Sequence, residues 1–153
     1  MFLPEPYSTP HNLPSLREAR PSNQIHLLFW DRPTPQGLHY LATYNNAQTH
    51  HYRDLLTADL QPRQKFLHFH LHLDQQVDRL HRLCDTCPQS MVLLQGFDLV
   101  LTYLRVQKDS PLTSFWQILR QHRKLAVPLW ILLPTALLPP AWDHDRVLHI
   151  SAE

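Results

Sequence analysis

Met91-Val92-Leu93-Leu94 and Val127-Pro128-Leu129-Trp130-Ile131-Leu132-Leu133 are the two stretches of the sequence that decide the fold. Each is a short, continuous apolar run, which is the pattern expected of a strand buried on both faces of a sheet. Strands of this kind occur mainly in parallel sheets that are covered by helices on both sides. The two stretches therefore predict an α/β fold.

The segments around these stretches supply the other elements of that fold. Asp74 is expected to cap a helix that runs through Cys84, and Ser110-Pro111 is expected to open another that carries Phe115 and His122. Further strands are predicted over residues 65–73 and 146–150. This alternation favours right-handed βαβ units and a mostly parallel sheet of about four strands with flanking helices.

The N-terminal third is predicted to differ from this pattern. Residues 1–23 are rich in proline and lack periodicity, which is typical of an extended or disordered arm. Residues 24–30 and 38–44 look like strands separated by turn residues, so they predict an antiparallel hairpin at one edge of the sheet. Residues 49–60 are expected to form a short helix. The chain is thus interpreted as an arm followed by a single α/β domain over residues 24–153.

The composition describes a globular domain without a strong electric field. Of the 153 residues, 43% are hydrophobic and 18% are charged, which is far from the composition of disordered chains. The formal net charge is only +1, so nucleic acid is not an expected partner. The N-terminus lacks the features of a secretory signal, and prolines interrupt the most apolar stretch, residues 125–142. We therefore expect a cytoplasmic protein with no membrane span.

Gly37 and Gly96 are the only glycines in the sequence. A phosphate-binding loop needs several glycines, because its backbone must approach the phosphates closely and adopt positive φ. A Walker A loop or a dinucleotide fingerprint therefore cannot be built from this chain. Ser90 and Ser114 also lack the context of a nucleophile elbow, so we expect a domain without a catalytic site.

His68, His70 and His72 give the strongest local indication of chemistry. Alternate side chains of a strand share one face at a spacing of about 6.6–6.8 Å, so two of these imidazoles could hold one metal ion such as zinc. Three residues are candidates for a third ligand: Asp74, His81 and Asp98. The alternative is a strand whose second face is half-exposed or covered by helices.

Cys84 and Cys87 form a Cys-x-x-Cys pair, which fits half of a zinc site or a redox couple. A redox pair sits at a helix N-terminus, where the dipole lowers the thiol pKa, whereas this pair lies near the predicted end of a helix. A zinc site would need two more ligands, such as His81 and one distant histidine. The alternative is a pair of ordinary buried or half-buried cysteines.

Residues 91–134 carry a partial family pattern. Met91-Val-Leu-Leu-Gln-Gly-Phe-Asp98, Phe115-Trp116 through His122-Arg123, and Val127-Pro-Leu-Trp-Ile-Leu-Leu-Pro134 occur in that order. They resemble the Walker B strand, the following helix with its arginine, and the next strand of P-loop NTPases, particularly the STAND and AAA+ types. The chain has no Gly-x-x-x-x-Gly-Lys-Ser/Thr motif, and its acidic position is shifted behind Gln95-Gly96-Phe97. The resemblance therefore implies a degenerate member kept for its surface.

Two functional hypotheses follow. The first is a non-enzymatic protein-interaction or regulatory domain that needs no cofactor and binds another protein or a second copy of itself. Three tryptophans are its candidate contact residues: Trp30, Trp116 and Trp142. The alternative is a metal-dependent enzyme or metal sensor that uses zinc bound to the histidine-rich strand 68–72. Four residues could complete that zinc site: His81, Cys84, Cys87 and Asp98.

Overall fold

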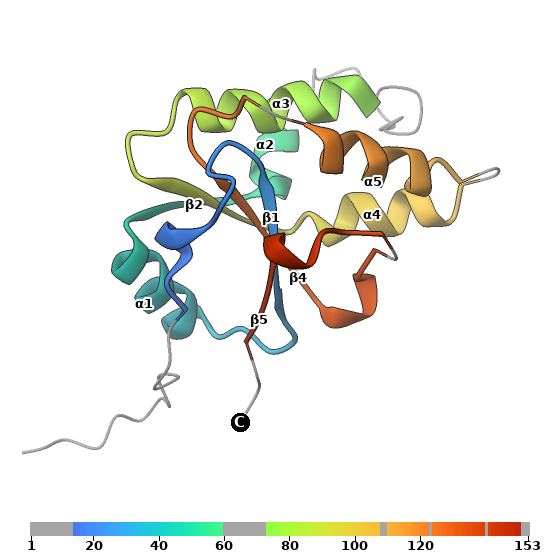
Figure 1. Ribbon diagram of the computed structural model, residues 1–153. Coiled ribbons are helices and arrows are strands. Elements are labelled where there is room, and N and C mark those ends of the chain that lie inside the picture. Colours follow the sequence, from blue (N-terminus) through green and yellow to red (C-terminus); the bar gives the residue numbers. More distant parts are fainter. Residues whose placement is uncertain (1–13, 60–72, 108–109, 123, 140, 151–153) are drawn as a thin grey trace, which may run out of the picture.

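The protein is built on a parallel sheet with helices on both faces (Figure 1). The computed structural model describes residues 14–59, 73–107, 110–122, 124–139 and 141–150. Within these ranges, five strands form the sheet in the order β2-β3-β4-β1-β5: β1 (Ile25–Trp30), β2 (Ala47–His51), β3 (Met91–Gln95), β4 (Leu129–Leu133) and β5 (Val147–Ile150). All pairings between these strands are parallel, so the predicted α/β class and parallel sheet are confirmed.

Helices connect the strands. Those in the described ranges are α1 (Pro35–Asn45), α2 (Tyr52–Asp59), α3 (Leu73–Asp85), α4 (Asp98–Arg105) and α5 (Leu112–Gln121), with short 3-10 turns η1 (Leu16–Glu18), η3 (Thr135–Leu137) and η4 (His144–Arg146). Helix α1 packs on one face of the sheet, and α2 to α5 pack on the other (Figure 1). None of the helices described is both long and apolar enough to span a bilayer.

Two hydrophobic cores lie on the two faces of the sheet. Ile25, Leu27 and Phe29 of β1 belong to the core under α3, α4 and α5, whereas Leu28 and Trp30 belong to the core under α1. Side chains of a strand alternate between the two faces, so every residue of β1 is buried only because both faces are covered. The same double coverage explains the continuous apolar runs in β3 and β4.

The predicted antiparallel hairpin is wrong. Residues 38–44 lie in α1, and β1 pairs in parallel with β4 and β5. Thr34 caps the helix by accepting the Gly37 N–H at 2.9 Å, and Pro35 occupies the first helical position. These are signals that start a helix, in a segment that also fits a turn between two strands.

Strand β2 was not predicted from the sequence. It covers the first residues of the predicted helix 49–60, and α2 begins only at Tyr52. Its sequence, Ala-Gln-Thr-His-His, is polar because β2 is an edge strand that is only partly buried. The predicted strand 65–73 lies outside the described residues except for Leu73, which starts α3.

The last ten residues of the predicted arm pack against the domain. Leu16 is fully buried, and its N–H donates to Oδ1 of Asn45 at the end of α1, at 2.7 Å. The Asn45 amide in turn donates to the carbonyl oxygens of Pro14 and Leu41, both at 3.1 Å. A buried asparagine with its amide satisfied in this way fixes residues 14–18 on α1.

Arg146 is a buried charged side chain that ties the last strand to the first. Its Nη1 donates to the Ile25 carbonyl at 3.3 Å, and its Nη2 donates to the Arg120 carbonyl and to Oδ2 of Asp143, both at 2.9 Å. The guanidinium also lies 4.7 Å from the centre of the Trp142 ring. One cation therefore joins β1, the end of α5 and the turn before β5.

Replacing Arg146 is expected to destabilise the fold strongly. The substitution Arg146→Met leaves two backbone carbonyls and a carboxylate without this donor. We therefore expect the free energy of unfolding to fall by about 2–4 kcal/mol. Asp143 is half-exposed and can be solvated, which limits the loss. Urea unfolding followed by tryptophan fluorescence measures the change. Arg120→Met is the control and should cost under about 1 kcal/mol; equal losses for the two variants would contradict the role given to Arg146.

Candidate functional site

The carboxyl ends of β1 and β4 are where a sheet of this kind would hold a ligand. The connection after β1 runs through α1 towards β2, whereas the connection after β4 runs on the opposite face towards β5. Adjacent strands whose connections leave in opposite directions open a crevice, and α/β proteins bind ligands in such crevices. Residues 31–34 and 134–137 follow the two strands at this point.

Asp31 bridges this crevice with its carboxylate. Oδ1 accepts the backbone N–H of Thr135 at 2.7 Å, and Oδ2 accepts the hydroxyl of the same residue at 3.0 Å. The loop after β4 thus has its donors occupied by a carboxylate of the same chain, where an anionic ligand would need them free. The contact also ties the two loops together across the switch point.

Trp30 packs against the first turn of α1 from the core. A Cβ atom on Gly37 would lie 2.8 Å from Cη2 of Trp30, so the indole packs directly on the first turn of the helix. Pro35 has no N–H, and the Gly37 N–H is bonded to Thr34. These residues use or remove N–H groups that a helix N-terminus offers to a phosphate.

An imidazole covers the carboxyl end of β3. Gly96 has a φ of +82°, and a Cβ atom on it would lie 2.6 Å from Nδ1 of His51, the last residue of β2. The same Nδ1 accepts the N–H of Arg53 at 3.1 Å. Glycine is therefore required here by both its backbone conformation and the close approach of the ring. Asp98, a predicted third metal ligand, lies half-buried in the first turn of α4.

Only some of the predicted metal ligands lie among the residues that the structure describes. His68, His70 and His72 lie outside the described residues. In the part of the chain that the structure describes, no three His, Cys, Asp or Glu side chains gather closely enough to hold a metal ion. His81, Cys84, Cys87, Asp74 and Asp98 therefore do not form a complete metal site among themselves.

Cys84 and Cys87 are free thiols with different surroundings. Cys84 is buried on the inner face of α3, where burial and the nearby Cys87 and Asp85 raise its pKa to about 12. The half-buried Cys87 donates its S–H to the carbonyl oxygens of Gln89 and Met91, at 3.5 and 3.4 Å. Reactive thiols need a lowered pKa, so Cys84 has the surroundings of a structural cysteine.

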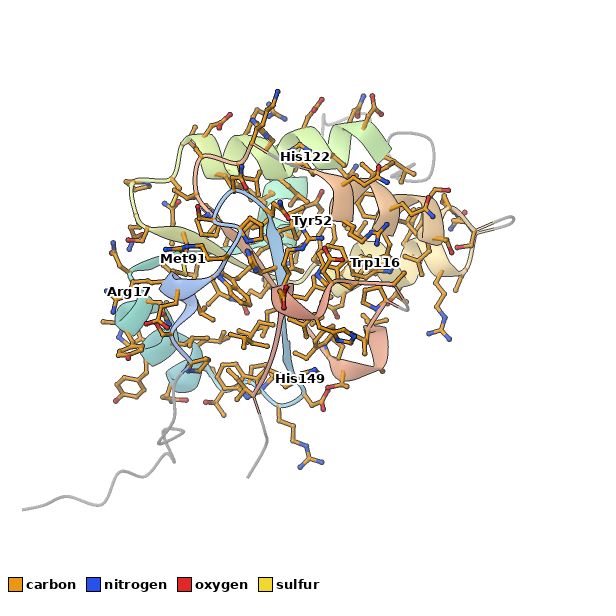
Figure 2. The ribbon with its side chains drawn as sticks, viewed as in Figure 1. Arg17, Tyr52, Met91, Trp116, His122 and His149 are labelled. Carbon is orange, nitrogen blue, oxygen red and sulfur yellow. The ribbon has the colours of Figure 1, made fainter. Side chains whose placement is uncertain are left out.

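His81 pairs with a histidine that the sequence analysis did not single out as its partner. Nδ1 of His81 lies 2.9 Å from Nε2 of His122, which follows α5 and is labelled in Figure 2. The two rings are nearly perpendicular. Nε2 of His81 lies 3.3 Å from Oδ2 of Asp85, one helical turn further along α3. The three side chains form a continuous row, Asp85–His81–His122, that links α3 to the end of α5. No spacing in the sequence indicates it, because the histidines are 41 residues apart.

Two open hollows lie on the surface, one beside α3 and the other beside the turn before β5. One of about 650 Å³ is lined by the polar side of α3: Gln75, Asp78, Arg79, His81 and Arg82. The other, of about 550 Å³, is lined by Pro21, Gln24, Trp142 and the turn 143–146. Ligand sites usually combine an enclosed apolar lining with a few convergent polar groups. Both hollows are open rather than enclosed, so neither has the form of a small-molecule site.

The three tryptophans expected to contact a partner lie mostly in the interior. Trp30, Trp116 and Trp142 are 6, 8 and 7% exposed. Trp116 and Trp142 meet edge to face with ring centres 5.6 Å apart, and Nε1 of Trp142 donates to the Arg146 carbonyl at 3.3 Å. Their role in binding a partner stays a prediction, and such a contact would reach only their exposed edges.

No family model matches the chain, and no curated protein or solved structure matches it significantly.

His26, His50 and His122 are the histidines whose pKa is lowered in the fold. His26 is fully buried, with Nε2 2.8 Å from the Pro21 carbonyl and its ring stacked on Trp130. Burial is the main cause that lowers the pKa of all three histidines. The unfolded chain therefore binds protons at these positions more readily than the folded chain does.

Stability is expected to fall as the pH drops below about 6.5, the pKa of an unfolded histidine. Protonation at each of the three histidines lowers the free energy of unfolding by up to about 1.4 kcal/mol per pH unit, until the pH reaches the lowered pKa of that histidine. Urea unfolding at intervals between about pH 7.5 and pH 5 measures this slope. His26→Gln keeps a donor for the Pro21 carbonyl and cannot titrate, so it should flatten the slope. A stability that is independent of pH over this range would contradict the lowered pKa values.

Proposed function

We propose that the protein is a non-enzymatic interaction or regulatory domain on a degenerate P-loop-like fold. The observation that carries the proposal is the Asp31–Thr135 contact across the crevice between β1 and β4. A carboxylate of the domain itself uses the two donors of Thr135 that a ligand at this position would need. The domain keeps the sheet and helices of a ligand-binding fold, and it acts by binding a partner through its surface.

The arrangement of strands supports the relation to P-loop proteins. Residues 91–134 form β3, α4, α5 and β4, and the two strands pair in parallel with Val92 opposite Leu129. A strand, helices and a second parallel strand in this order are the elements on which the resemblance to P-loop NTPases rests.

Helix α4 presents the surface that best fits a protein partner. Leu99 and Val106, at its start and just past its end, are 52 and 73% exposed, and Tyr103 between them is half-buried. Positions seven residues apart lie on the same side of a helix. Exposed apolar side chains on one line are a feature of contact surfaces. We infer that another protein, or a second copy of this chain, binds along this side of α4.

The closed crevice predicts that the protein does not bind nucleotides. Titration with a fluorescent ATP analogue up to about 1 mM, a weak affinity, should give no saturable signal for the natural protein. Asp31→Ala removes the bridging carboxylate but adds none of the glycines of a phosphate loop, so it should also fail to bind. Saturable binding by the natural protein would overturn the proposal, whereas binding by Asp31→Ala alone would show that the carboxylate blocks a usable site.

The proposed partner surface predicts the effect of charge on α4. The double variant Leu99→Glu and Val106→Glu should lose self-association or a retained partner, because it places charge in the apolar line. Size exclusion with light scattering measures self-association, and pull-down from lysate measures retention of a partner. Thr102→Glu, exposed on the same helix but not apolar, is the matched control and should have a smaller effect. A strictly monomeric natural protein that retains nothing would contradict the proposal.

The metal hypothesis remains a second candidate, because its histidines at positions 68, 70 and 72 lie outside the described residues. Elemental analysis of protein purified without an affinity tag tests it directly. Stoichiometric zinc that is lost in His68→Ala with His70→Ala would support a metal site on this segment. Absence of metal, together with a melting temperature that added zinc does not change, would exclude it.

A further inference from the structure

The hollow of about 550 Å³ lies at the amino ends of β1 and β5, at the opposite end of the sheet from the crevice. Gln24 comes just before β1, and residues 143–146 come just before β5, which pairs in parallel with β1. We propose that this hollow is a binding site for the guanidinium group of an arginine residue in a partner polypeptide. The site is separate from the side of α4 proposed above, so either can fail without the other.

Gln24 brings an amide to the hollow from an almost fully buried position. The residue is only 8% exposed, and it lines the hollow. Among the described residues its amide forms no hydrogen bond, yet it is not one of the fully enclosed polar groups, so the exposed part of the residue includes the amide. Amides in such positions normally have a hydrogen-bond partner. The oxygen of this amide can accept from a guest in the hollow, and its nitrogen can donate to one.

Asp145 gives the hollow a negative charge that no cation among the described residues balances. Its side chain is exposed at the hollow and forms no ion pair or hydrogen bond with any of them. The carboxylate of Asp143 differs, because it contacts Arg146 at 2.9 Å and Arg120 at 4.0 Å. Arg146 is 1% exposed, and its guanidinium donates to groups of the domain itself. The unbalanced charge in the hollow is therefore negative and attracts a cationic guest.

A guanidinium group fits these acceptors better than a metal ion or an ammonium group does. In the ranges that the structure describes, no three His, Cys, Asp or Glu side chains gather closely enough to hold a metal ion. A guanidinium directs five N–H donors outward in one plane, so it can donate to the Asp145 carboxylate and to the Gln24 oxygen at the same time. It is also less strongly hydrated than an ammonium group, so it loses less when it leaves water.

The form of the hollow indicates that the guanidinium belongs to a polypeptide. The hollow is open rather than enclosed, so it receives one end of a guest and leaves the rest outside. A guanidinium has no acceptor for the amide N–H groups of Gln24, whereas the carbonyl oxygen of a peptide has one. An arginine residue within a polypeptide offers both groups.

NMR titration of the natural protein with N-acetyl-L-arginine amide tests the site, at low ionic strength so that charges are weakly screened. The side-chain amide of Gln24, the indole N–H of Trp142 and the backbone amide of Asp145 should shift and saturate, because all three residues line the hollow. A single residue with few contacts should bind with a dissociation constant of about 1–10 mM. N-acetyl-L-citrulline amide has the same shape without the charge and should bind at least about tenfold more weakly. Methylguanidine lacks the peptide and should bind about threefold more weakly.

Two variants separate the contributions of charge and amide. Asp145→Asn removes the charge and keeps the shape, so binding of the arginine probe should weaken at least about threefold. Gln24→Met keeps the length of the side chain and removes its amide, so the arginine probe should bind no better than methylguanidine. Asp54→Asn is the matched control and should leave binding unchanged. Asp54 has a 75% exposed side chain in α2, which follows β2 at the other edge of the sheet.

Three results would overturn the site: no saturable shifts at the hollow, equal binding of the citrulline probe, or equal binding by Asp145→Asn and Asp54→Asn. Methylguanidine that binds as tightly as the arginine probe would overturn the assignment of the guest to a polypeptide. If Gln24→Met does not fold, Asp145→Asn decides, because Asp145 is exposed and its replacement leaves the core intact.

Discussion

The burial of β1 on both faces is the constraint on which the rest of the structure depends. All six of its residues are inaccessible, and it pairs with β4 on one side and β5 on the other. A central strand of this kind requires helices on both faces of the sheet. Helix α1 therefore leaves β1 towards one face, and the connection after β4 must take the other. The crevice at the carboxyl ends of these two strands follows directly from that arrangement.

Contacts within the chain occupy the positions where such a fold binds its ligands. Asp31 bonds across the crevice to Thr135, Trp30 packs on Gly37, and His51 covers Gly96. Asp31, Trp30 and His51 each lie at a strand end or next to one, where the sheet already holds the backbone in place. Each of the two glycines allows the close approach of a side chain of the same domain, Trp30 at Gly37 and His51 at Gly96.

The sequence predicted the parts of the fold that depend on local pattern, and it failed where pairing over long distances decides. The continuous apolar runs at Met91 and Leu129 identified β3 and β4, because burial on both faces leaves a direct compositional signal. The helix start at Thr34-Pro35 looked like a turn, since the same residue types serve both structures. Polar β2 was missed because only its pairing with β3 makes it a strand.

The candidate site was less predictable, because its residues meet only after folding. His81 was predicted as a possible metal ligand, but its contact, His122, follows another helix, α5. The Asp31–Thr135 contact joins loops that no local motif connects. The tryptophans that were predicted as contact residues are buried. Aromatic side chains are common in both cores and interfaces, so the sequence alone does not distinguish the two roles.

The strand order has a consequence for synthesis on the ribosome. Strand β1 is made first, yet its neighbours in the sheet, β4 and β5, are the last strands to be made. A nascent chain must therefore carry an apolar, unpaired strand until nearly all of the domain has left the exit tunnel. Sheets closed by such distant pairings form slowly, and their exposed strands are the segments that chaperones protect from aggregation.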